Sequence, residues 1–506
     1  MMLLVKNSFS FDICDISDFI DAITTYSNIP TRLFIDNKFV ASSGGSTIEL
    51  ESPLTGCRLA TVSAAQIDDV DRAVQSSTDA YAVWKQKNPS ARRTLLHRLA
   101  DLVERDASLF ASLEAIDAGI LYQDSLRLNV QQAVENLRYF AGWADKVDGL
   151  TLSIPDGMAY TRRVPIGVCA AIIPWNAPLM ITMWKLAPAL AGGNTIIINT
   201  PEMCPLYGQK LAQLVVEVGF PPGVVNILCG LGHVAGAALS EHMGVRKISF
   251  TGSPSVGRQI MAAAARSNLK KLTLELGGKG PSIVFDDADW ENALFWMSLG
   301  ITINNGQVCV AGSRIYVQHT IYDRFVEEFA KRISTFLHGD PLLGTTTEGP
   351  LINRTQRDKV LSFIEAGKSS GARIVSGGEQ LTVKGYFVAN TAFADVSHDT
   401  EIMKEEIFGP LACVASFENE DDVIAKANDS VYGLGAAVFT ADLNKAFRIT
   451  EAIEVGQITV NSWGALHANT PFGGVKESGF GRDMGKEAIN EWTSAKTVKW
   501  NIVGSH

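Results

Sequence analysis

The sequence predicts an α/β protein with two doubly wound parallel-sheet domains, and three observations carry this prediction. The chain has 506 residues, of which 46% are hydrophobic, whereas a single hydrophobic core stops growing at about 250–300 residues. After residue 149, short apolar segments alternate with segments of helical periodicity, which is typical of parallel strands joined by crossover helices. The same alternation starts again after Pro281, so we expect a domain boundary at 277–281.

The first part of the chain precedes this alternation. Residues 1–32 are expected to form an N-terminal extension, and a hairpin follows over 33–40, around an Asp-Asn pair. Apolar residues then recur at helical spacing over 63–87 and 90–113. This spacing predicts two amphipathic helices that cover an apolar surface.

Apolar runs of strand length define the expected sheets. The expected strands of the first series are 168–173, 195–199, 224–228, 247–250 and 271–275, with helices over 179–191, over 206–218 and from about 255, and a second series begins at 282–285. The longest apolar region, 164–198, is interrupted by prolines, asparagines and a lysine that a lipid-facing helix would have to satisfy internally. We therefore interpret it as buried strand, loop, helix and strand. The alternating segment 495–502 predicts a terminal strand of the kind that pairs with another subunit.

Composition and charge exclude several classes of protein. The net charge is −10 and Lys and Arg are scattered along the chain, so we expect no nucleic-acid partner. The seven cysteines form no C-x-x-C pair, so we expect neither a structural zinc site nor a disulfide framework, and no metal. The apolar run at residues 1–5 is too short for a signal peptide, and acidic residues follow it. We expect a soluble cytoplasmic protein without a membrane partner.

The segment 303–314 contains the candidate nucleophile, Cys309. A free cysteine is usually an inert, buried hydrophobe, but Gly306 and Gln307 precede Cys309 and small residues follow it, and the six other cysteines lack such neighbours. Glu275 lies 34 positions upstream, before a double glycine. A thiol and a carboxylate base form a usable catalytic pair.

Two further segments could bind a ligand. Asn176 directly follows a predicted buried strand, where its carboxamide could donate to an oxyanion or instead satisfy the backbone of a proline-rich turn; the sequence leaves both interpretations open. Residues 250–258 place a strand, a Gly/Ser turn and a helix start in the order that cradles phosphate, without the G-x-G-x-x-G fingerprint. The glycines of 230–236 match that fingerprint only weakly.

Two later segments are more ambiguous. Residues 404–410 pair acidic residues with Phe408 before a Gly-Pro turn, which could hold a ribose and brace a flat ring, although a solvated charge run is the commoner explanation. Residues 471–482 contain four glycines in twelve positions. This segment is expected to be a structured loop rather than a helix or strand.

Together these motifs resemble the NAD(P)-dependent aldehyde dehydrogenase superfamily of the hydrolytic type, from about Leu33 to about Ile502. Their spacing agrees: 133 positions separate Asn176 from Cys309, and 97 separate Cys309 from Glu406. The resemblance implies two Rossmann-like, doubly wound parallel-sheet domains and a small oligomerisation β-flap. The implied divisions are an NAD-binding domain over 33–146 and 166–277, a catalytic domain over 278–477, and bridging strands over 147–165 and 486–506. A homodimer or homotetramer is expected.

The resemblance also implies a mechanism. Cys309 as thiolate attacks the aldehyde, and the Asn176 side chain and the Cys309 N–H hold the oxyanion. Glu275 then activates water to hydrolyse the thioester, so the product is a carboxylic acid. Lys185 either is an ordinary charged residue or helps to position the oxyanion motif.

The same resemblance assigns the remaining site residues. Val256 and Gly232 would flank the adenine, Glu202 would bind the adenosine ribose, and Glu406 with Phe408 would hold the nicotinamide ribose and ring. The other implied cofactor residues are Ile173, Pro174, Trp175, Asn199, Phe250, Thr251, Gly252, Ser253, Gly257, Leu276 and Gly277. The expected substrate pocket consists of Ala177, Met180, Trp184, Ile303, Val308, Trp463 and Leu466.

Departures from the family pattern refine these expectations. Asn199 stands where relatives usually carry lysine and His233 where many carry proline, so cofactor affinity is expected to be reduced, with NAD favoured over NADP because Glu202 repels a 2′-phosphate. Ala177 replaces a common bulky aromatic, and the expected lining contains no cation, which predicts a neutral, apolar aldehyde, aromatic or aliphatic. The alternatives are a coenzyme A-acylating enzyme, disfavoured by Glu275, and a non-catalytic binding protein of the same fold.

Overall fold

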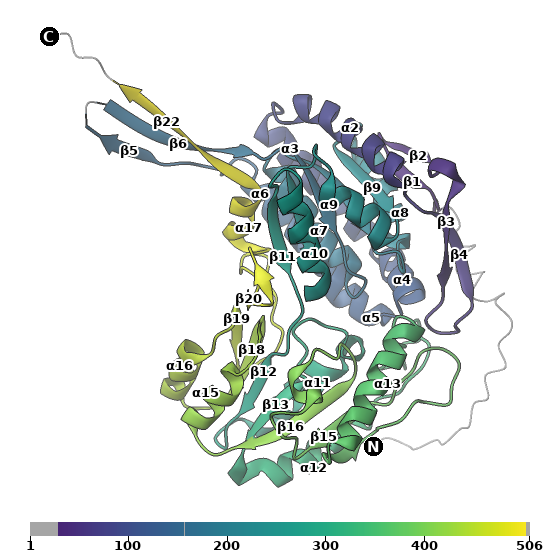
Figure 1. Cartoon of the computed structure of the whole chain (residues 1–506), viewed down its shortest axis with the longest axis vertical. Helices are drawn as coiled ribbons and strands as arrows, with labels where there is room; N and C mark the ends of the chain where they lie inside the picture. Colours follow the sequence, from purple (N-terminus) through teal and green to yellow (C-terminus); the bar gives the residue numbers. More distant parts are fainter. Residues whose placement is uncertain (1–28, 156, 502–506) are drawn as a thin grey trace.

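The computed structural model describes residues 29–155 and 157–501 (Figure 1). Most of the expected extension over 1–32 and the last residues of the 486–506 segment lie outside this part. The two α/β bodies are stacked in Figure 1, with the earlier and later parts of the chain in separate bodies. The α/β fold class with two Rossmann-like sheets is confirmed.

The first body is built on an eight-stranded sheet with the order β2-β1-β9-β8-β7-β10-β11-β21. Its parallel centre consists of β7 (Val168–Ile172), β8 (Thr195–Thr200), β9 (Val225–Cys229), β10 (Lys247–Thr251) and β11 (Lys271–Glu275). The hairpin strands β1 (Leu33–Ile35) and β2 (Lys38–Val40) complete one edge in antiparallel order. The central strands read as continuous apolar runs because helices bury both faces of a parallel sheet.

Helices cover both faces of this sheet. They are α2 (Ile67–Trp84), α3 (Pro89–Arg105), α4 (Ala107–Ala118), α5 (Tyr122–Asp124), η2 (Ser125–Val130), α6 (Gln131–Trp143), α7 (Pro178–Ala191), α8 (Leu206–Val218), η3 (Gly232–Gly236), α9 (Ala237–Glu241) and α10 (Pro254–Arg266). The single helix expected over 90–113 is wrong, because the chain breaks between α3 and α4 at Asp106, which leaves helical geometry (φ −97°, ψ 19°). The Asp106 carboxylate there pairs with Arg105 and Lys210.

The second body contains a seven-stranded sheet with the order β14-β15-β16-β13-β12-β18-β19. Its strands are β12 (Pro281–Val284), β13 (Arg314–Gln318), β14 (Arg373–Ser376), β15 (Thr391–Ala394), β16 (Leu411–Phe417), β18 (Gly435–Phe439) and β19 (Gln457–Val460). Its helices are α11 (Trp290–Thr302), η4 (Ile303–Gly306), η5 (His319–Ile321), α12 (Tyr322–Ile333), α13 (Arg354–Ser369), α14 (Glu401–Lys404), α15 (Glu420–Asn428) and α16 (Leu443–Ala452). Strand β12 starts a new sheet six residues after β11 ends, as the restart of the alternation indicates.

The glycine-rich segment 471–482 ties the two bodies together. It was expected to be a structured loop without strands, but it contains two short ones. Strand β20 (Val475–Lys476) pairs with β17 (Tyr432–Gly433), and β21 (Gly479–Phe480) pairs with β11 of the first sheet. Gly479 makes the second pairing possible, since it has a φ of +105° and a Cβ there would lie 1.9 Å from the Leu274 carbonyl oxygen. The bridge therefore holds the end of β11 against the second body.

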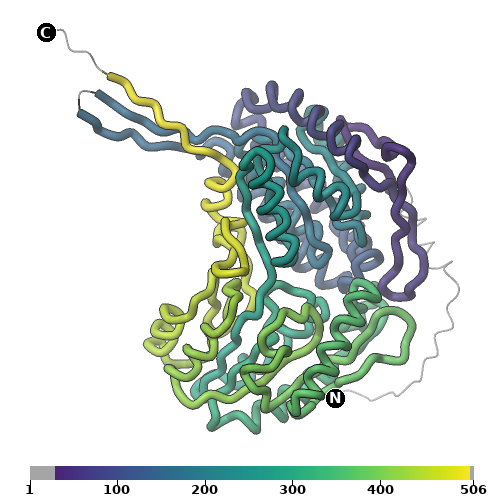
Figure 2. Tube along the Cα trace, viewed as in Figure 1, coloured from purple at the N-terminus to yellow at the C-terminus, as the bar shows by residue number. Residues whose placement is uncertain are grey.

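A three-stranded antiparallel sheet, β22-β6-β5, projects from the first body (Figures 1 and 2). It consists of β5 (Thr151–Ile154), β6 (Gly157–Pro165) and β22 (Thr493–Asn501), so the predicted terminal strand pairs with a segment more than 300 positions earlier in its own chain. Helix α17 (Gly485–Glu491) leads into β22, and a separate ribbon, β3 (Thr47–Glu51) with β4 (Arg58–Ser63), lies at the opposite side of the first body.

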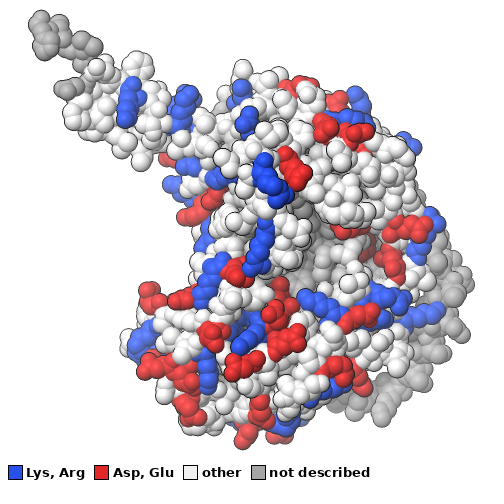
Figure 3. Space-filling view, in the orientation of Figure 1, with Lys and Arg blue, Asp and Glu red and all other residues white. Residues whose placement is uncertain are grey.

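The surface agrees with the sequence composition. On the face in Figure 3, basic and acidic side chains alternate over both bodies and form no single basic stripe. Within residues 29–501, leaving out 156, no helix is both long and apolar enough to cross a membrane.

Candidate active site

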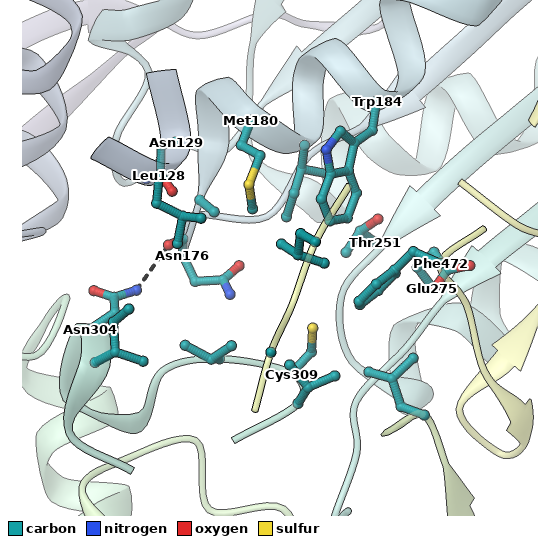
Figure 4. Close-up of a pocket in the computed structure, with 18 of the residues that line it drawn as sticks. Leu128, Asn129, Asn176, Met180, Trp184, Thr251, Glu275, Asn304, Cys309 and Phe472 are labelled. Atoms are coloured by element: carbon teal, nitrogen blue, oxygen red, sulfur yellow. Dashed lines mark hydrogen bonds between the residues drawn. The ribbon is translucent and has the colours of Figure 1, made fainter. Parts of the chain in front are cut away.

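A cavity between the two bodies brings together the three residues that the sequence singles out as catalytic (Figure 4). Asn176 reaches it from the turn between β7 and α7, Glu275 from the last position of β11, and Cys309 from the segment after η4 in the second body. In Figure 4 the Cys309 sulfur and the Asn176 carboxamide project into the same space. Residues separated by 133 positions therefore form one site.

The loop that carries Cys309 is held in an unusual conformation. Asn304, Asn305 and Gly306 all have positive φ angles of 49°, 54° and 65°, a region that asparagine and glycine enter more easily than other residues. A Cβ at Gly306 would lie 2.3 Å from the Gly409 carbonyl oxygen, so this position requires glycine. The amide residues around Cys309 thus serve the geometry of the loop.

Amide hydrogen bonds fix this loop to its surroundings. Gln307 donates from Nε2 to the Asn304 carbonyl (3.1 Å) and accepts at Oε1 from the Ile352 N–H (3.0 Å). Asn305 donates from Nδ2 to the Pro350 carbonyl (3.1 Å). These bonds satisfy buried backbone groups that would otherwise be costly, and they hold the backbone immediately before Cys309.

Asn176 is coupled to the same loop. Its Nδ2 donates to the Gln307 carbonyl (2.9 Å), and its own carbonyl accepts from Asn304 Nδ2 (2.9 Å; dashed line in Figure 4). The carboxamide therefore satisfies backbone, as one of the two interpretations from the sequence requires, while it also lines the cavity beside Cys309. A ligand oxygen could compete for this donor because only one carbonyl occupies it.

The thiol and the carboxylate are both poorly solvated. Burial raises the pKa of the Cys309 thiol to about 12, and the Glu406 and Glu275 carboxylates add to that rise. Burial also raises the pKa of Glu275 well above its ordinary value, Asp483 raises it further, and Lys185 opposes the rise. Both carboxylate oxygens of Glu275 lack a hydrogen-bond partner in the described part of the chain. A carboxylate whose pKa is raised in this way is a stronger base than an ordinary carboxylate.

Lys185 and Asp483 form a buried ion pair behind the cavity. Their side chains are 0% and 2% exposed, so Lys185 is not the ordinary solvated lysine that one interpretation of the sequence allowed. The sequence analysis missed Asp483, which lies just beyond the glycine-rich segment 471–482 and has no local signature. Burial raises the pKa of Asp483, whereas the Lys185 ammonium lowers it.

The predicted cofactor residues of the first body lie at the carboxyl ends of its parallel strands. They follow or end β7 (Ile173, Pro174, Trp175), β8 (Asn199, Glu202), β9 (Gly232), β10 (Phe250, Thr251, Gly252, Ser253) and β11 (Leu276, Gly277), and Val256 and Gly257 lie in the first turn of α10. Open α/β sheets bind ligands at this edge. The predicted set is thus brought together in space.

Unsatisfied groups at this edge fit a nucleotide. Asn199 Oδ1 and Thr251 Oγ1 are buried without a hydrogen-bond partner among the described residues. Helix α10 begins here, with the Ser253 hydroxyl accepting from the Val256 N–H (3.4 Å) and Pro254 in the first turn. Free N–H groups at a helix N-terminus favour phosphate.

The segment 404–410 contributes to the same site, so its interpretation as a solvated charge run is wrong for Glu406. Glu406 Oε1 accepts from the Gly278 N–H (3.0 Å), and burial raises the pKa of Glu406 to about 7. Phe408 meets Trp175 edge to face, with ring centroids 5.2 Å apart. The Glu406 carboxylate can come this close to the backbone only because residue 277 is glycine, since a Cβ there would lie 2.0 Å from Glu406 Oε2.

Comparison with known proteins identifies the family. Residues 39–498 match the model of the aldehyde dehydrogenase family. An aldehyde dehydrogenase of Davidiella tassiana is 46% identical over 471 residues, which cover 93% of this chain and 95% of that protein. The chain belongs to the aldehyde dehydrogenase family. It is therefore an NAD-dependent oxidoreductase that acts on the aldehyde group, as the sequence motifs predict.

Other relatives of this aldehyde dehydrogenase also match it over nearly the whole of both chains. Retinal dehydrogenase 2 of Mus musculus is 45% identical over 476 residues, which cover 93% of this chain and 92% of that protein. The structure of an aldehyde dehydrogenase from Bacillus cereus in complex with NAD⁺ has a TM-score of 0.93 at 40% identity and covers 95% of this chain and 99% of its own. The similarity thus extends through both bodies of the dehydrogenase.

The cavity of the dehydrogenase includes every residue that the sequence assigned to the substrate pocket: Ala177, Met180, Trp184, Ile303, Val308, Trp463 and Leu466. It also includes residues that sequence analysis did not find. Those from the first body are Ile120, Asp124, Leu128, Asn129, Ile181, Thr251 and Leu276, and those from the second are Asn304, Val310, Leu434, Gly464 and Phe472. Thr251 and Leu276 had been assigned to the cofactor. Asn304, Val310 and Phe472 lie in segments that the sequence singled out, although they were not assigned to the pocket. Ile120, Asp124, Leu128 and Asn129 had no sequence signal, because the segment around α5 and η2 reaches the cavity only through tertiary packing.

Proposed function

We propose that this dehydrogenase oxidises a neutral aldehyde with an apolar body, aromatic or aliphatic, to its carboxylic acid, with Cys309 as nucleophile and Glu275 as the base for hydrolysis. The observation that carries the proposal is the single cavity that contains Asn176, Glu275 and Cys309 beside the cofactor edge of the first sheet. Attack of the Cys309 sulfur on the aldehyde forms a C–S bond, and the Asn176 carboxamide with the Cys309 N–H stabilises the oxyanion.

The cofactor is proposed to lie along the carboxyl edge of β7 to β11. Unpartnered Asn199 Oδ1 and Thr251 Oγ1, the α10 N-terminus and Glu406 with Phe408 are the groups that would hold it. When bound, NAD supplies the hydride acceptor and a positively charged ring. NAD is proposed over NADP because the Glu202 carboxylate would repel a 2′-phosphate.

Attack on the aldehyde gives a thiohemiacetal, and loss of a hydride from its carbon to bound NAD would leave a thioester on Cys309. Hydrolysis of this thioester is assigned to Glu275. Its raised pKa and unpartnered oxygens support a role in which it takes a proton from water as that water attacks the thioester. The C–S bond then breaks, and the thiol and a carboxylic acid are released. This role favours hydrolysis over transfer of the acyl group to coenzyme A.

The neutral, apolar substrate class rests on the walls of the cavity. No lysine, arginine or histidine lines it in the described part of the chain, whereas two tryptophans and several aliphatic side chains do. A carboxylate-bearing aldehyde would find no counter-charge there. The relative named retinal dehydrogenase 2 is named for an apolar aldehyde, which supports the same class.

The domain roles and assembly are proposed as follows. Residues 33–146 and 166–277 form the NAD-binding domain and 278–477 the catalytic domain, while 147–165 and 486–506 form an oligomerisation flap of a homodimer or homotetramer. Exposed apolar side chains on the projecting sheet, among them Leu152, Met158 and Trp500 (55% exposed), support a role in association. Light scattering should therefore give at least twice the monomer mass, and Trp500→Glu with Leu152→Glu should lower it; a monomeric wild type would contradict the assembly.

NADH formation with purified protein tests the reaction itself. Benzaldehyde, hexanal and succinic semialdehyde are each assayed with NAD and with NADP, for the wild type and for Cys309→Ala. We expect NAD-dependent turnover of benzaldehyde or hexanal that the substitution abolishes, with Cys57→Ala as an unaffected control, since Cys57 is exposed and distant in sequence from the site. Faster oxidation of succinic semialdehyde would overturn the apolar substrate class, and turnover by Cys309→Ala would overturn the nucleophile.

A further inference from the structure

One carboxylate of the cavity takes no part in the reaction described above. Asp124, at the end of α5, lines the cavity together with Ile120 and Leu128. Its side chain makes no hydrogen bond or ion pair within the described part of the chain, and a neighbouring cation, Arg127, acts on it only through its charge. Charged groups in a largely apolar pocket are costly unless they are paired. An unpaired carboxylate in a substrate cavity is therefore a candidate recognition group.

The segment that carries Asp124 is anchored rather than loose. Ser125 Oγ donates to Glu114 Oε2 (2.5 Å) and Asn129 Nδ2 donates to the same oxygen (2.8 Å). Glu114 Oε1 in turn accepts from the Leu179 N–H at the start of α7 (3.0 Å), just after Asn176 and Ala177. On the other side, the Tyr122 N–H donates to the Pro341 carbonyl (2.9 Å).

These bonds place Asp124 in a fixed position relative to the oxyanion motif. The same buried carboxylate, Glu114, holds both the η2 segment after Asp124 and the first turn of α7. A recognition group that is held rigidly in this way can select substrates by the distance between the reacting carbonyl and their far end. Figure 4 shows the η2 side chains Leu128 and Asn129 on the cavity wall across from Glu275.

The charges around Asp124 define what it can bind. Arg127 is the one cation whose field acts appreciably on it, and Glu348 is a neighbouring acid whose own pKa Asp124 raises. Arg127 is exposed and forms no ion pair with Asp124 among the described contacts. Burial raises the pKa of Asp124 because its charged form is poorly solvated. A hydrogen-bond donor supplied by a ligand would stabilise that charged form.

We infer that Asp124 is a specificity-determining residue that accepts a hydrogen bond from a hydroxyl group at the end of the substrate remote from the aldehyde. This inference rests on the proposed function and narrows its substrate class to neutral hydroxyaldehydes whose apolar body spans the cavity. The apolar lining residues contact the body of the substrate, Asn176 holds the aldehyde oxygen, and Asp124 holds the hydroxyl group.

The test compares substrates that differ by a methyl and a hydroxyl group. The rigid pair is 4-ethylbenzaldehyde and 4-(hydroxymethyl)benzaldehyde, and the flexible pair is nonanal and 8-hydroxyoctanal. In the wild type, kcat/KM for at least one hydroxylated member should exceed that of its partner by about tenfold or more, the size of a charge-assisted hydrogen bond in a partly open site. Asp124→Asn should reduce this ratio and Asp124→Leu should reverse it. Asp68→Asn, an isosteric change at an exposed position on α2, should leave it unchanged.

Three outcomes would overturn the inference. One is a wild-type ratio at or below one for both pairs. Another is a fall in kcat/KM for both members of a pair alike in Asp124→Asn, which would indicate a structural role. The third is faster turnover of 4-(trimethylammoniomethyl)benzaldehyde than of the hydroxymethyl compound, since that cation has no proton to donate and would be selected by charge alone.

Binding separates this inference from the proposed function. In Cys309→Ala the same aldehydes are titrated against the fluorescence of the cavity tryptophans Trp184 and Trp463, so the ratio of dissociation constants is measured without turnover. Tighter binding of the hydroxylated member, lost in Cys309→Ala/Asp124→Asn, supports the inference even if the wild type oxidises none of the panel. Equal binding of both members overturns it even if oxidation proceeds.

Discussion

Replacing Lys185 by methionine removes the only partner that forms an ion pair with Asp483 among the described residues. The two side chains are 0% and 2% exposed, so water cannot replace the lost ammonium. Two buried carboxyl groups, Asp483 and Glu275, would then lose the cation that most strongly lowers the pKa of each. Methionine nearly matches the length of lysine, so the substitution tests charge rather than volume.

The expected cost in stability is large for a single substitution. Breaking a buried ion pair by removing one partner costs about 3–5 kcal/mol. Lys368→Met is the matched control, because it breaks an exposed pair with Glu365 (2.7 Å, side chains 38% and 69% exposed), and such pairs contribute about 0–1 kcal/mol. Urea titration of both variants, with the slope held equal to that of the wild type, gives the two differences in free energy of unfolding.

The same substitution should alter the pH dependence of activity. Lys185 lowers the pKa of Glu275, so its loss raises that pKa further. Because a general base acts in its deprotonated form, and hydrolysis follows the formation of NADH, the acid limb of the kcat profile should move to higher pH in Lys185→Met and remain in place in Lys368→Met.

A double variant distinguishes the ion pair from simple packing damage. Lys185→Met/Asp483→Leu removes both charges, and a buried pair replaced by apolar residues usually recovers stability. We expect the double variant to be more stable than Lys185→Met alone. The reasoning fails if Lys185→Met unfolds within about 1 kcal/mol of the wild type, or if its acid limb coincides with that of the wild type.

The remaining predictions concern the catalytic and cofactor groups. Glu275→Gln should still release a first equivalent of NADH in a burst and then stall, because the thioester is not hydrolysed; steady turnover at the wild-type rate would contradict its role as base. Burial raises the pKa of Cys309 from about 9 to about 12, so the free protein should react with iodoacetamide at pH 8 about 30-fold more slowly than a simple thiol, the thousandfold loss of thiolate being partly offset by higher nucleophilicity; mass spectrometry of the Cys309 peptide measures this, and equal rates would refute the burial argument. Asn199→Lys should lower the dissociation constant for NAD about five- to tenfold by adding a cation beside the adenosine ribose, measured by calorimetry; unchanged affinity would show that the buried, unpartnered Asn199 oxygen does not face the cofactor.

Much of the fold could be predicted because its signals are local. Strands β7 to β11 are buried on both faces and therefore appear as apolar runs, and the segments between them show helical periodicity. The break at Asp106 escaped prediction, since the apolar pattern continues across it and only ion pairs to Arg105 and Lys210 mark it.

The candidate site divides in the same way. Cys309, Glu275 and Asn176 could be singled out because each has a distinctive neighbourhood in the sequence. The sequence could not distinguish Glu406 from a solvated charged residue. Its carboxylate is buried against a distant segment and accepts a hydrogen bond from the Gly278 N–H, 128 positions earlier in the chain.

The sequence by itself determined the alternation of strands and helices in the first sheet, the family, and which residue types could react, because periodicity and motif spacing depend on neighbours along the chain. Only the tertiary structure decided that Lys185 meets Asp483 across 298 positions and that Asp124 lines the cavity unpaired. Burial and pairing arise from contacts between distant segments. They set the charge and the pKa of a side chain, and no local pattern encodes them.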